Sequence, residues 1–395
     1  MKTVMSDRRW AKAYPELGTG PVPTEPCISP TYFELERERV FRRVWLNMGR
    51  VEEIPKPGDY VVRNLAVCNA SILLMRGDDG VVRGFHNVCS HRGNKLAWDE
   101  KGSCRGYLTC NFHSWSYDSQ GQLKWVPDEE NFFDLQKSQH GLTPVATDIW
   151  EGFIFINLAP RPQETLRAYL DGAAEQLAGC GFEQLTLAHT FKVEERANWK
   201  VALDAQNEVY HLPFQHRYSF PDVFALKENR YTRLLDVKFF RHHSVYSCEI
   251  NPEHKMSTSE ALMSRLDTSA TTCRLSLIGD FDFYTIFPNF VILLFRGMAN
   301  DYFMTYNFWP LAVDRTIWEF RVYFPPAENA GQRIAQEYMK CRIRNVLQED
   351  ATAHETVHAG LASRAKTHIL LQDDEIQIRH FHKALEDHVG FYRGA

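Results

Sequence analysis

Residues 87–93, NVCSHRG, decide how this chain folds, because they place Cys89 and His91 two positions apart after a β-like run. A second pair follows in residues 110–115, CNFHSW, which contain Cys110 and His113. Each pair offers one thiolate and one imidazole beside turn-forming residues. Two β loops could therefore present all four side chains to one point.

Three interpretations of these four residues are open. They could be buried cysteines with unrelated histidines, or a tetrahedral zinc site. They could also hold a Rieske 2Fe-2S cluster, in which one iron takes two thiolates and the other takes two imidazoles. Zinc fingers usually pair cysteine with cysteine and histidine with histidine, whereas here each loop carries one of each. The spacing therefore favours the cluster.

Composition limits the classes of function. The chain has 395 residues, enough for two or three domains with sizeable cores. A formal net charge of −5 gives no reason to expect nucleic acid or an anionic membrane as a partner. The longest apolar run, residues 290–295, is far shorter than the roughly 20 residues of a membrane span.

The cysteines and the N-terminus bear on the compartment. Nine cysteines, an odd number, suit a reducing compartment better than the disulfide framework of a secreted domain. The N-terminal residues contain no apolar segment typical of a secretory signal. We therefore expect a cytoplasmic protein with no membrane segment.

The hydrophobic pattern predicts an α+β fold, because helices and strands segregate along the chain. We expect a helical segment at residues 1–44, an antiparallel β domain at 45–160 and a mixed domain at 161–395. Residues 251–270 are polar and predict a mobile excursion. In the last domain, periodicity predicts helices at 163–179, 195–212, 331–362 and 374–388, and strands within 230–250 and 272–325.

A second set of polar residues lies in residues 198–216, NWKVALDAQNEVYHLPFQH. On an unbroken helix His211 and His216 would diverge by about 140° and could not share a metal ion. Pro213 removes a helical hydrogen bond and disfavours helical geometry at the preceding residue. We therefore expect the helix to kink or end between the two histidines, which can then converge.

A carboxylate ligand is expected from the helix at 331–362. Asp350 lies on one helical stripe with Val346, Val357 and Leu361, so it should be buried on the apolar face. A buried carboxylate is costly unless it is paired, and a metal ion would offset that cost. A capped or hydrogen-bonded structural aspartate is the alternative. Glu349 and Glu355 fall off the stripe and are expected to be solvated.

The first set of residues resembles the Rieske domain of bacterial ring-hydroxylating oxygenases. Residues 89–93, CSHRG, and 110–121, CNFHSWSYDSQG, match that family's C-x-H-R-G and C-x-x-H-x-W-x-Y-x-x-x-G. The resemblance implies that Trp115 and Tyr117 pack over the cluster, although both would suit a core equally well. It implies one iron bound by two cysteines and one by two histidines, namely Cys89, Cys110, His91 and His113.

The second set resembles the catalytic domain of the same family, with N-W-K, an acidic residue, H-x-x-x-x-H and a later E-D-x-x-x-x-E segment. The resemblance implies that His211, His216 and Asp350 form a 2-His-1-carboxylate triad for Fe²⁺. It implies that Glu208 bridges the electron path between subunits, and Glu208 could also orient His211. The sequence has Asp204-Ala205 where many members have Glu-Asn, which puts the polarity of the pocket in question.

The resemblance covers nearly the whole chain and implies a Rieske 2Fe-2S domain followed by a catalytic domain of helix-grip type, an antiparallel sheet surrounded by helices. It implies the terminal oxygenase component of a multicomponent system, taking electrons from NAD(P)H through a reductase, with or without a ferredoxin. O₂ would be activated at the mononuclear iron. It also implies a homotrimer, with or without a small β subunit.

The substrate is expected to be an aromatic or other apolar organic acid. A quaternary ammonium compound, or an O- or N-demethylation substrate, is the alternative. Residues 281–309 are rich in aromatic side chains that could wall an apolar pocket or a cationic cage, or simply fill the sheet core. Two other classes of protein remain open, a pure electron carrier and a zinc-stabilised binding protein.

Overall fold

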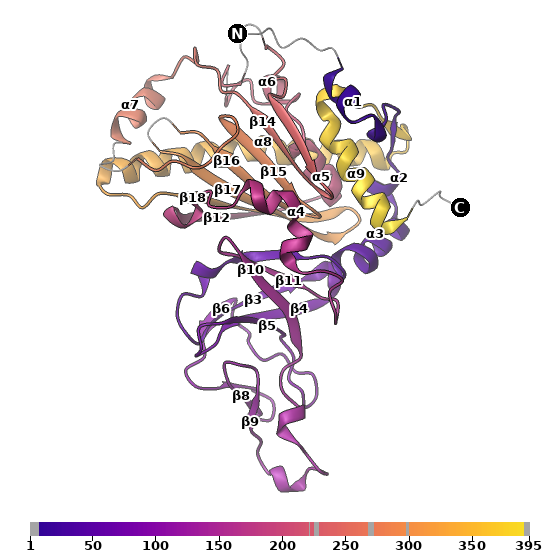
Figure 1. The fold of residues 1–395 in the computed structure, drawn as a ribbon, viewed down its shortest axis with the longest axis vertical. Coiled ribbons are helices and arrows are strands. Elements are labelled where there is room, and N and C mark those ends of the chain that lie inside the picture. Colours follow the sequence, from indigo (N-terminus) through magenta and orange to yellow (C-terminus); the bar gives the residue numbers. More distant parts are fainter. Residues whose placement is uncertain (1–7, 221, 225–228, 268–271, 298–299, 391–395) are drawn as a thin grey trace. The chain divides into compact units, whose positions relative to one another are not determined.

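The computed structural model describes residues 8–220, 222–224, 229–267, 272–297 and 300–390. The chain divides into two compact units, which are treated separately (Figure 1). One unit contains residues 37–169. The other contains residues 1–36 together with 170–395. In the described part of the chain, no helix combines the length and the apolar character needed to cross a bilayer.

The unit of residues 37–169 is built on two antiparallel sheets. The larger has seven strands in the order β2-β11-β10-β5-β4-β3-β6, and the smaller has three in the order β7-β8-β9. Hairpins join neighbouring strands, as at the turn between β4 and β5, where Gly80 adopts a φ of 79°. The strands are β2 (Leu46–Arg50), β3 (Asp59–Leu65), β4 (Ala70–Arg76), β5 (Val82–His86), β6 (Lys101–Ser103), β7 (Leu108–Thr109), β8 (Ser116–Tyr117), β9 (Leu123–Trp125), β10 (Pro144–Trp150) and β11 (Phe153–Asn157).

The other unit is built on one antiparallel sheet of seven strands, in the order β12-β18-β17-β16-β15-β14-β13. Every residue of β15 is buried, so the centre of this sheet is covered on both faces. The strands are β12 (Thr186–Glu195), β13 (Asp236–Phe240), β14 (His243–Cys248), β15 (Phe281–Ile286), β16 (Phe290–Phe295), β17 (Tyr302–Ala312) and β18 (Arg315–Phe324).

Helices surround this sheet. The longest, α8, has 33 residues, passes across the sheet in Figure 1 and contacts β12 and α5. The helix α9 packs against β14. The structure thus confirms the predicted α+β class. The helices of this unit are α5 (Trp199–Gln206), α6 (Leu212–Gln215), α7 (Thr258–Leu266), α8 (Ala330–Ala362) and α9 (Ile376–Val389), and α4 (Leu166–Gln176) crosses the boundary between the two units.

The N-terminal segment completes the same unit. Its helices α1 (Arg9–Ala13), α2 (Glu25–Ile28) and α3 (Pro30–Glu36) precede a short π-helix, and α2 contacts α8 while α3 contacts α9. The short strand β1 (Val22–Pro23) pairs with β19 (His368–Ile369). A fully buried ion pair anchors the segment, because Glu36 lies 2.7 Å from the Lys200 ammonium. Segments from the two ends of the chain therefore close one unit.

The local structure departs from the expected pattern in two places. Residues 251–270 contain the helix α7, which begins at a capping box formed by Ser257 and Glu260, while residues 268–270 lie outside the described part. The helix predicted at 195–212 already ends at Gln206. Pro213 sits in the first turn of the new helix α6, where a missing N–H costs little, so it starts a helix rather than interrupting one.

Candidate functional site

The four residues of the first set converge at one end of the smaller sheet. Cys89 follows β5, and Cys110 follows β7. Both side chains are buried and lie within hydrogen-bonding reach of each other. The imidazole rings of His91 and His113 are also neighbours, with 4.7 Å between their centroids. The structure therefore groups thiol with thiol and imidazole with imidazole.

The surroundings of these four residues fit a cluster with two unlike irons. Trp115 stacks on the His91 ring with 4.9 Å between centroids, and the Tyr117 hydroxyl lies 3.3 Å from the Cys89 sulfur. The buried Nδ1 of His91 has no hydrogen-bond partner among the described residues, so an imidazole nitrogen here is left for another ligand. The donor set of two sulfurs and two ring nitrogens suits the Rieske cluster.

The second set of residues converges in the other unit. His211 and His216 flank the single turn of α6, and Asp350 comes from α8. Nε2 of His216 lies 3.0 Å from Oδ1 of Asp350, and Nε2 of His211 lies 3.8 Å from the same oxygen. Each of the three residues offers one possible ligand atom, a ring nitrogen or a carboxylate oxygen, and these three atoms lie within 4.8 Å of one another. The site is partly screened from water, because His216 and Asp350 are buried.

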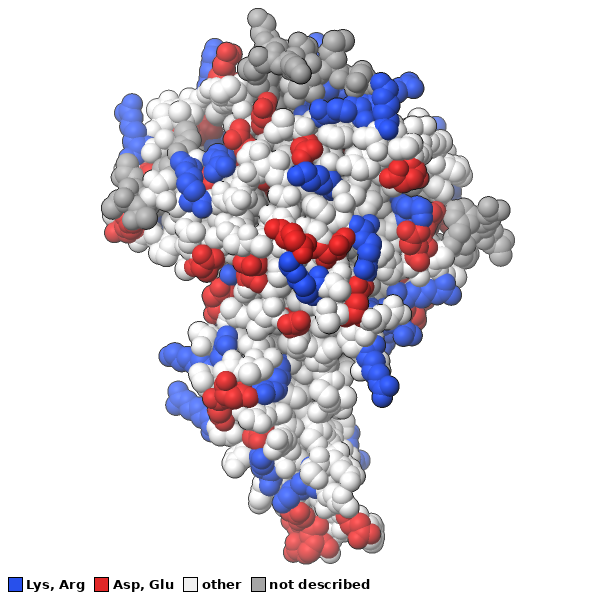
Figure 2. Space-filling model, viewed as in Figure 1, with Lys and Arg blue, Asp and Glu red and all other residues white. Residues whose placement is uncertain are grey.

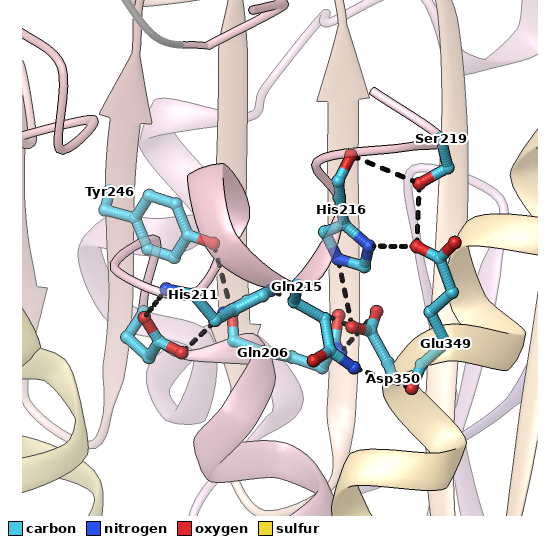
Figure 3. Close-up of polar contacts among 9 residues, drawn as sticks. Gln206, His211, Gln215, His216, Ser219, Tyr246, Glu349 and Asp350 are labelled. Carbon is cyan, nitrogen blue, oxygen red and sulfur yellow. Dashed lines mark hydrogen bonds and ion pairs between the residues drawn. The ribbon is translucent and has the colours of Figure 1, made fainter. Parts of the chain in front are cut away.

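Each histidine presents Nε2 to this centre because a carboxylate holds its Nδ1. Nδ1 of His211 makes a very short contact with Glu208, and the His211 backbone N–H donates to the same carboxylate at 3.1 Å. Nδ1 of His216 lies 2.8 Å from Glu349 (Figure 3). The expectation that Glu349 is solvated was therefore wrong. Only its position off the buried stripe of α8 was visible in the sequence.

Further hydrogen bonds fix these carboxylates (Figure 3). The Ser219 hydroxyl donates to Glu349 at 2.7 Å, and the Gln206 amide donates to Asp350 at 3.2 Å. The Tyr246 hydroxyl in turn donates to the Gln206 carbonyl at 3.0 Å. These three supporting residues were not predicted. Their side chains carry no metal-binding signal, and their roles follow only from the way α5, α8 and β14 pack.

The electrostatics of the site favour a bound cation. Burial alone would lower the pKa of His211, but the charge and hydrogen bond of Glu208, together with the charges of Asp350 and Glu375, raise that pKa to about 9. Burial alone would raise the pKa of Asp350, but a hydrogen bond from His216 and the charges of both histidines lower it. Three carboxylates thus surround two imidazoles. A divalent iron ion would balance this negative charge, and its preferred donors match the set.

A cavity of about 60 Å³ adjoins the two histidines and Asp350. Aromatic and aliphatic side chains wall it, and no lysine or arginine lines it within the described residues. Several of these side chains come from the predicted segment 281–309, and others from α8. The aromatic members of the wall are Phe220, Phe224, Tyr246, Phe281, Phe283, Phe295, Tyr302 and Tyr306.

The unusual pair Asp204-Ala205 does not line this cavity. Oδ2 of Asp204 lies 2.8 Å from Nε2 of His382 on α9, so the carboxylate faces the helix layer. Gln206, two residues later, lines the cavity instead. A polar amide is thus present beside the proposed iron ligands in spite of the departure. Val357, placed on the buried stripe of α8 by the sequence, is 49% exposed, and that part of the prediction was wrong.

Comparisons with known sequences agree with this geometry. Residues 44–144 match the Rieske 2Fe-2S domain. Residues 182–390, more than half of the chain, match the ring hydroxylating alpha subunit, catalytic domain. The carnitine monooxygenase oxygenase subunit of Acinetobacter baumannii is 29% identical over 85% of this chain and 84% of the relative. The glycine betaine monooxygenase oxygenase subunit of Chromohalobacter salexigens is 35% identical over 47% of this chain and 41% of the relative.

Two solved structures share the fold. The quaternary ammonium Rieske monooxygenase CntA superimposes with a TM-score of 0.76 at 23% identity, covering 93% of this chain and 95% of that one. Naphthalene 1,2-dioxygenase from Rhodococcus sp. superimposes with a TM-score of 0.77 at 21% identity, covering 97% and 98%. These matches confirm the resemblance found in the sequence. The chain therefore belongs to the Rieske ring-hydroxylating oxygenases, as a large subunit that carries both the Rieske domain and the catalytic domain.

Proposed function

We propose that this oxygenase hydroxylates a quaternary ammonium compound. The observation that carries the proposal is the cavity beside His211, His216 and Asp350, which has aromatic walls and no basic side chain within the described residues. Aromatic faces attract a cationic head group. An apolar acid, the substrate first expected from the sequence, has no cationic group for these faces to attract. The relatives named for carnitine and glycine betaine support the same class.

The protein uses the cofactors of its family, a Rieske 2Fe-2S cluster and a mononuclear iron, with O₂ as co-substrate and NAD(P)H as the distant electron donor. We assign Cys89, Cys110, His91 and His113 to the cluster. We assign His211, His216 and Asp350 to the iron. When bound, these groups supply electron transfer and O₂ activation.

The chain's own residues position and shield the reaction. Glu208 and Glu349 accept the Nδ1 protons of the two histidines and so fix the direction of each Nε2. The aromatic wall keeps water out of the cavity and orients one carbon of the substrate. In the overall reaction, one oxygen atom of O₂ is inserted into a C–H bond to give C–OH. The other oxygen atom leaves as water, and NAD(P)H supplies the two electrons that this requires.

We further propose that electrons cross between subunits of a homotrimer, with or without a β subunit, after delivery by a reductase or ferredoxin. Two observations support this path. The rings of His91 and His113 reach the surface of their unit. Around Glu208 the surface carries large exposed side chains, Tyr210, Phe214 and Tyr218. Exposed aromatic groups of this kind suit an interface between subunits. In this proposal Glu208 bridges the two iron sites.

An aromatic hydrocarbon is the second candidate substrate, favoured by the apolar wall and by the fold shared with naphthalene 1,2-dioxygenase. NADH-coupled O₂ uptake with a reductase separates the two. Choline, carnitine and glycine betaine would be compared with naphthalene and benzoate, and products identified by mass spectrometry. We expect oxygenated or demethylated product from at least one ammonium compound. Product from naphthalene or benzoate alone would overturn the proposal.

A further inference from the structure

A second and larger cavity, of about 460 Å³, opens next to the catalytic cavity. It lies between α7, the first half of α8 and the ends of β16 and β17, in the region of Figure 1 where α7 meets α8. The two cavities have three lining residues in common, namely Phe220, Phe295 and Tyr302. We call the larger one the outer cavity. A ligand leaving it past these three rings would arrive beside the proposed iron ligands.

Charged side chains line the outer cavity, and acids are in excess. Its carboxylates are Glu260, Asp267, Asp280 and Asp301, against the guanidinium groups of Arg296 and Arg342 and the imidazole of His254. Each arginine already has a carboxylate partner. Arg296 pairs with Asp301 at 2.6 Å, and Arg342 pairs with Glu260 at 2.5 Å. An anionic ligand would have to break one of these pairs to gain a cation. On Figure 2, by contrast, acids and bases mix over the outer surface of the face that is drawn.

The other two carboxylates, Asp267 and Asp280, have no basic partner among the described residues. Asp267 receives only a long hydrogen bond from the Asn300 amide, at 3.5 Å. Asp280 accepts the backbone N–H of Ile250 at 3.2 Å. Both residues are partly buried, so water and salt screen their charges less than those of an open surface. Burial raises the pKa of Asp267, as expected for a carboxylate that lacks a cation.

Aromatic rings complete the cavity and already accept a cation. The Arg342 guanidinium lies 5.0 Å from the centroid of Phe220 and 5.9 Å from that of Tyr338. Carboxylates without a basic partner and aromatic faces are two features that bind a cationic head group, and both line this cavity. Phe295 and Tyr302 belong to both cavities, so such a group would not leave an aromatic surface as it moved inward.

We propose that the outer cavity is a reception site for the cationic head group of the substrate, with Asp267 and Asp280 as its selecting residues. This inference rests on the proposed function, because it takes the substrate to be a quaternary ammonium compound. It adds that the protein recognises the positive charge before the substrate reaches the catalytic cavity. Selection for charge would then change mainly the affinity for substrate, with little effect on the rate of the chemical step.

The test uses the variant Asp267→Asn/Asp280→Asn in the holoenzyme, with Asp387→Asn as a matched control on an exposed acid of α9 that pairs with Lys383. Calorimetry would measure the binding of choline and of 3,3-dimethylbutan-1-ol, its neutral carbon isostere. We expect the double variant to weaken choline binding about tenfold at low salt, and less at high salt, because the lost interaction is electrostatic. Binding of the neutral isostere should not change.

Equal weakening for both probes would mean that the variant altered only the shape of the cavity, and unchanged choline binding would mean that the carboxylates do not select. Either outcome overturns the inference. The single variant Asp267→Asn guards against misfolding, because the Asn300 amide is the one partner of this carboxylate among the described residues, and it should show a smaller loss of the same kind. If wild-type protein binds choline through these residues but oxidises no ammonium compound, the proposed function fails while the cation site stands.

Discussion

Oε2 of Glu349 lies 2.8 Å from Nδ1 of His216, and the neighbouring residue on α8, Asp350, faces the other nitrogen of the same ring. Two successive residues of α8 therefore contact the same imidazole. Glu349 binds the nitrogen that points away from the proposed metal site, and Asp350 lies at the site beside the other nitrogen. Carboxylates in this position fix the orientation of a ligand and raise its basicity. Because Glu349 contacts the histidine and is not itself a proposed metal ligand, mutation can test its orienting role separately from ligation.

Replacing Glu349 with alanine should lower the affinity of the site for iron by about 10- to 100-fold, because His216 would lose its orienting partner. Competition with a chelator measures this directly, without reference to turnover. Glu355→Ala is the control, since that carboxylate lies on the same helix but pairs with Arg196 at 3.4 Å. Equal affinities for wild type and the Glu349 variant would contradict the assignment.

Glu208→Ala should slow electron transfer from the cluster to the iron while leaving the visible spectrum of the cluster intact. The carboxylate is the group through which the two sites are proposed to communicate, and it also holds Nδ1 of His211. Rapid mixing of reduced protein with O₂ and substrate would follow reoxidation of the cluster. Glu208→Gln can still accept a hydrogen bond, so it should recover iron binding better than alanine does. Fast reoxidation in both variants would exclude the bridge.

Phe283→Leu should raise KM for an ammonium substrate by several-fold, because a cation over an aromatic face is stabilised by roughly 0.5–2 kcal/mol. Phe283 is buried in the wall of the catalytic cavity, and leucine keeps the wall apolar. The neutral isostere serves as the comparison. If KM rises equally for both compounds, the ring contributes only packing.

The protein should lose stability as the pH falls from about 6.5 towards 4. Burial lowers the pKa of His380 and of His242 to about 4, and the neighbouring His388 also lowers that of His242. Both side chains are therefore neutral in the folded state but take up protons near pH 6.5 when unfolded. Their contribution is complete above that pH and disappears through pH 4, by about 3 kcal/mol for the buried His380 and by less for His242, which is partly exposed to solvent.

Denaturant unfolding at several pH values would show this slope. In His380→Gln the slope should flatten, because the amide can still donate to the Arg241 carbonyl, which His380 contacts at 2.9 Å, but does not titrate. His368→Gln alters an exposed histidine and should leave the slope as it is. An unchanged slope in the His380 variant would rule out this residue as a source.

The buried pair of Glu36 and Lys200 predicts an asymmetric response to mutation. Lys200→Met should destabilise the protein by about 3–5 kcal/mol, because it leaves a buried carboxylate without its cation. The double variant Glu36→Gln/Lys200→Met removes both charges and keeps an acceptor for the Trp199 indole N–H, which lies 3.1 Å from Glu36. It should recover most of the loss, as measured by guanidinium unfolding. Failure to recover would show that packing around the lysine chain dominates.

Much of the site could be predicted because its signals are local in the sequence. The members of each pair, such as Cys89 with His91 or His211 with His216, lie close together in the sequence, so their spacing alone indicates a shared site. Helical periodicity places Asp350 on a buried stripe. Glu349 could not be predicted in the same way, because its partner Ser219 lies on a distant segment and only the packing of α8 brings them together. Pro213 predicts a break in a helix, but the same rigid ring also suits the first turn of a helix, which is where Pro213 lies.

The pairing of β1 with β19 has a consequence for the order in which the two units can fold. Val22 is opposite Ile369, so β1 cannot complete this pairing until the distant segment that contains β19 has been translated. Residues 37–169 need no such wait, since their sheets are complete within themselves. Chains grow N-terminus first at about 5–20 residues per second. The unit of residues 37–169 can therefore fold on the nascent chain, while the other unit closes only after β19 has left the ribosome.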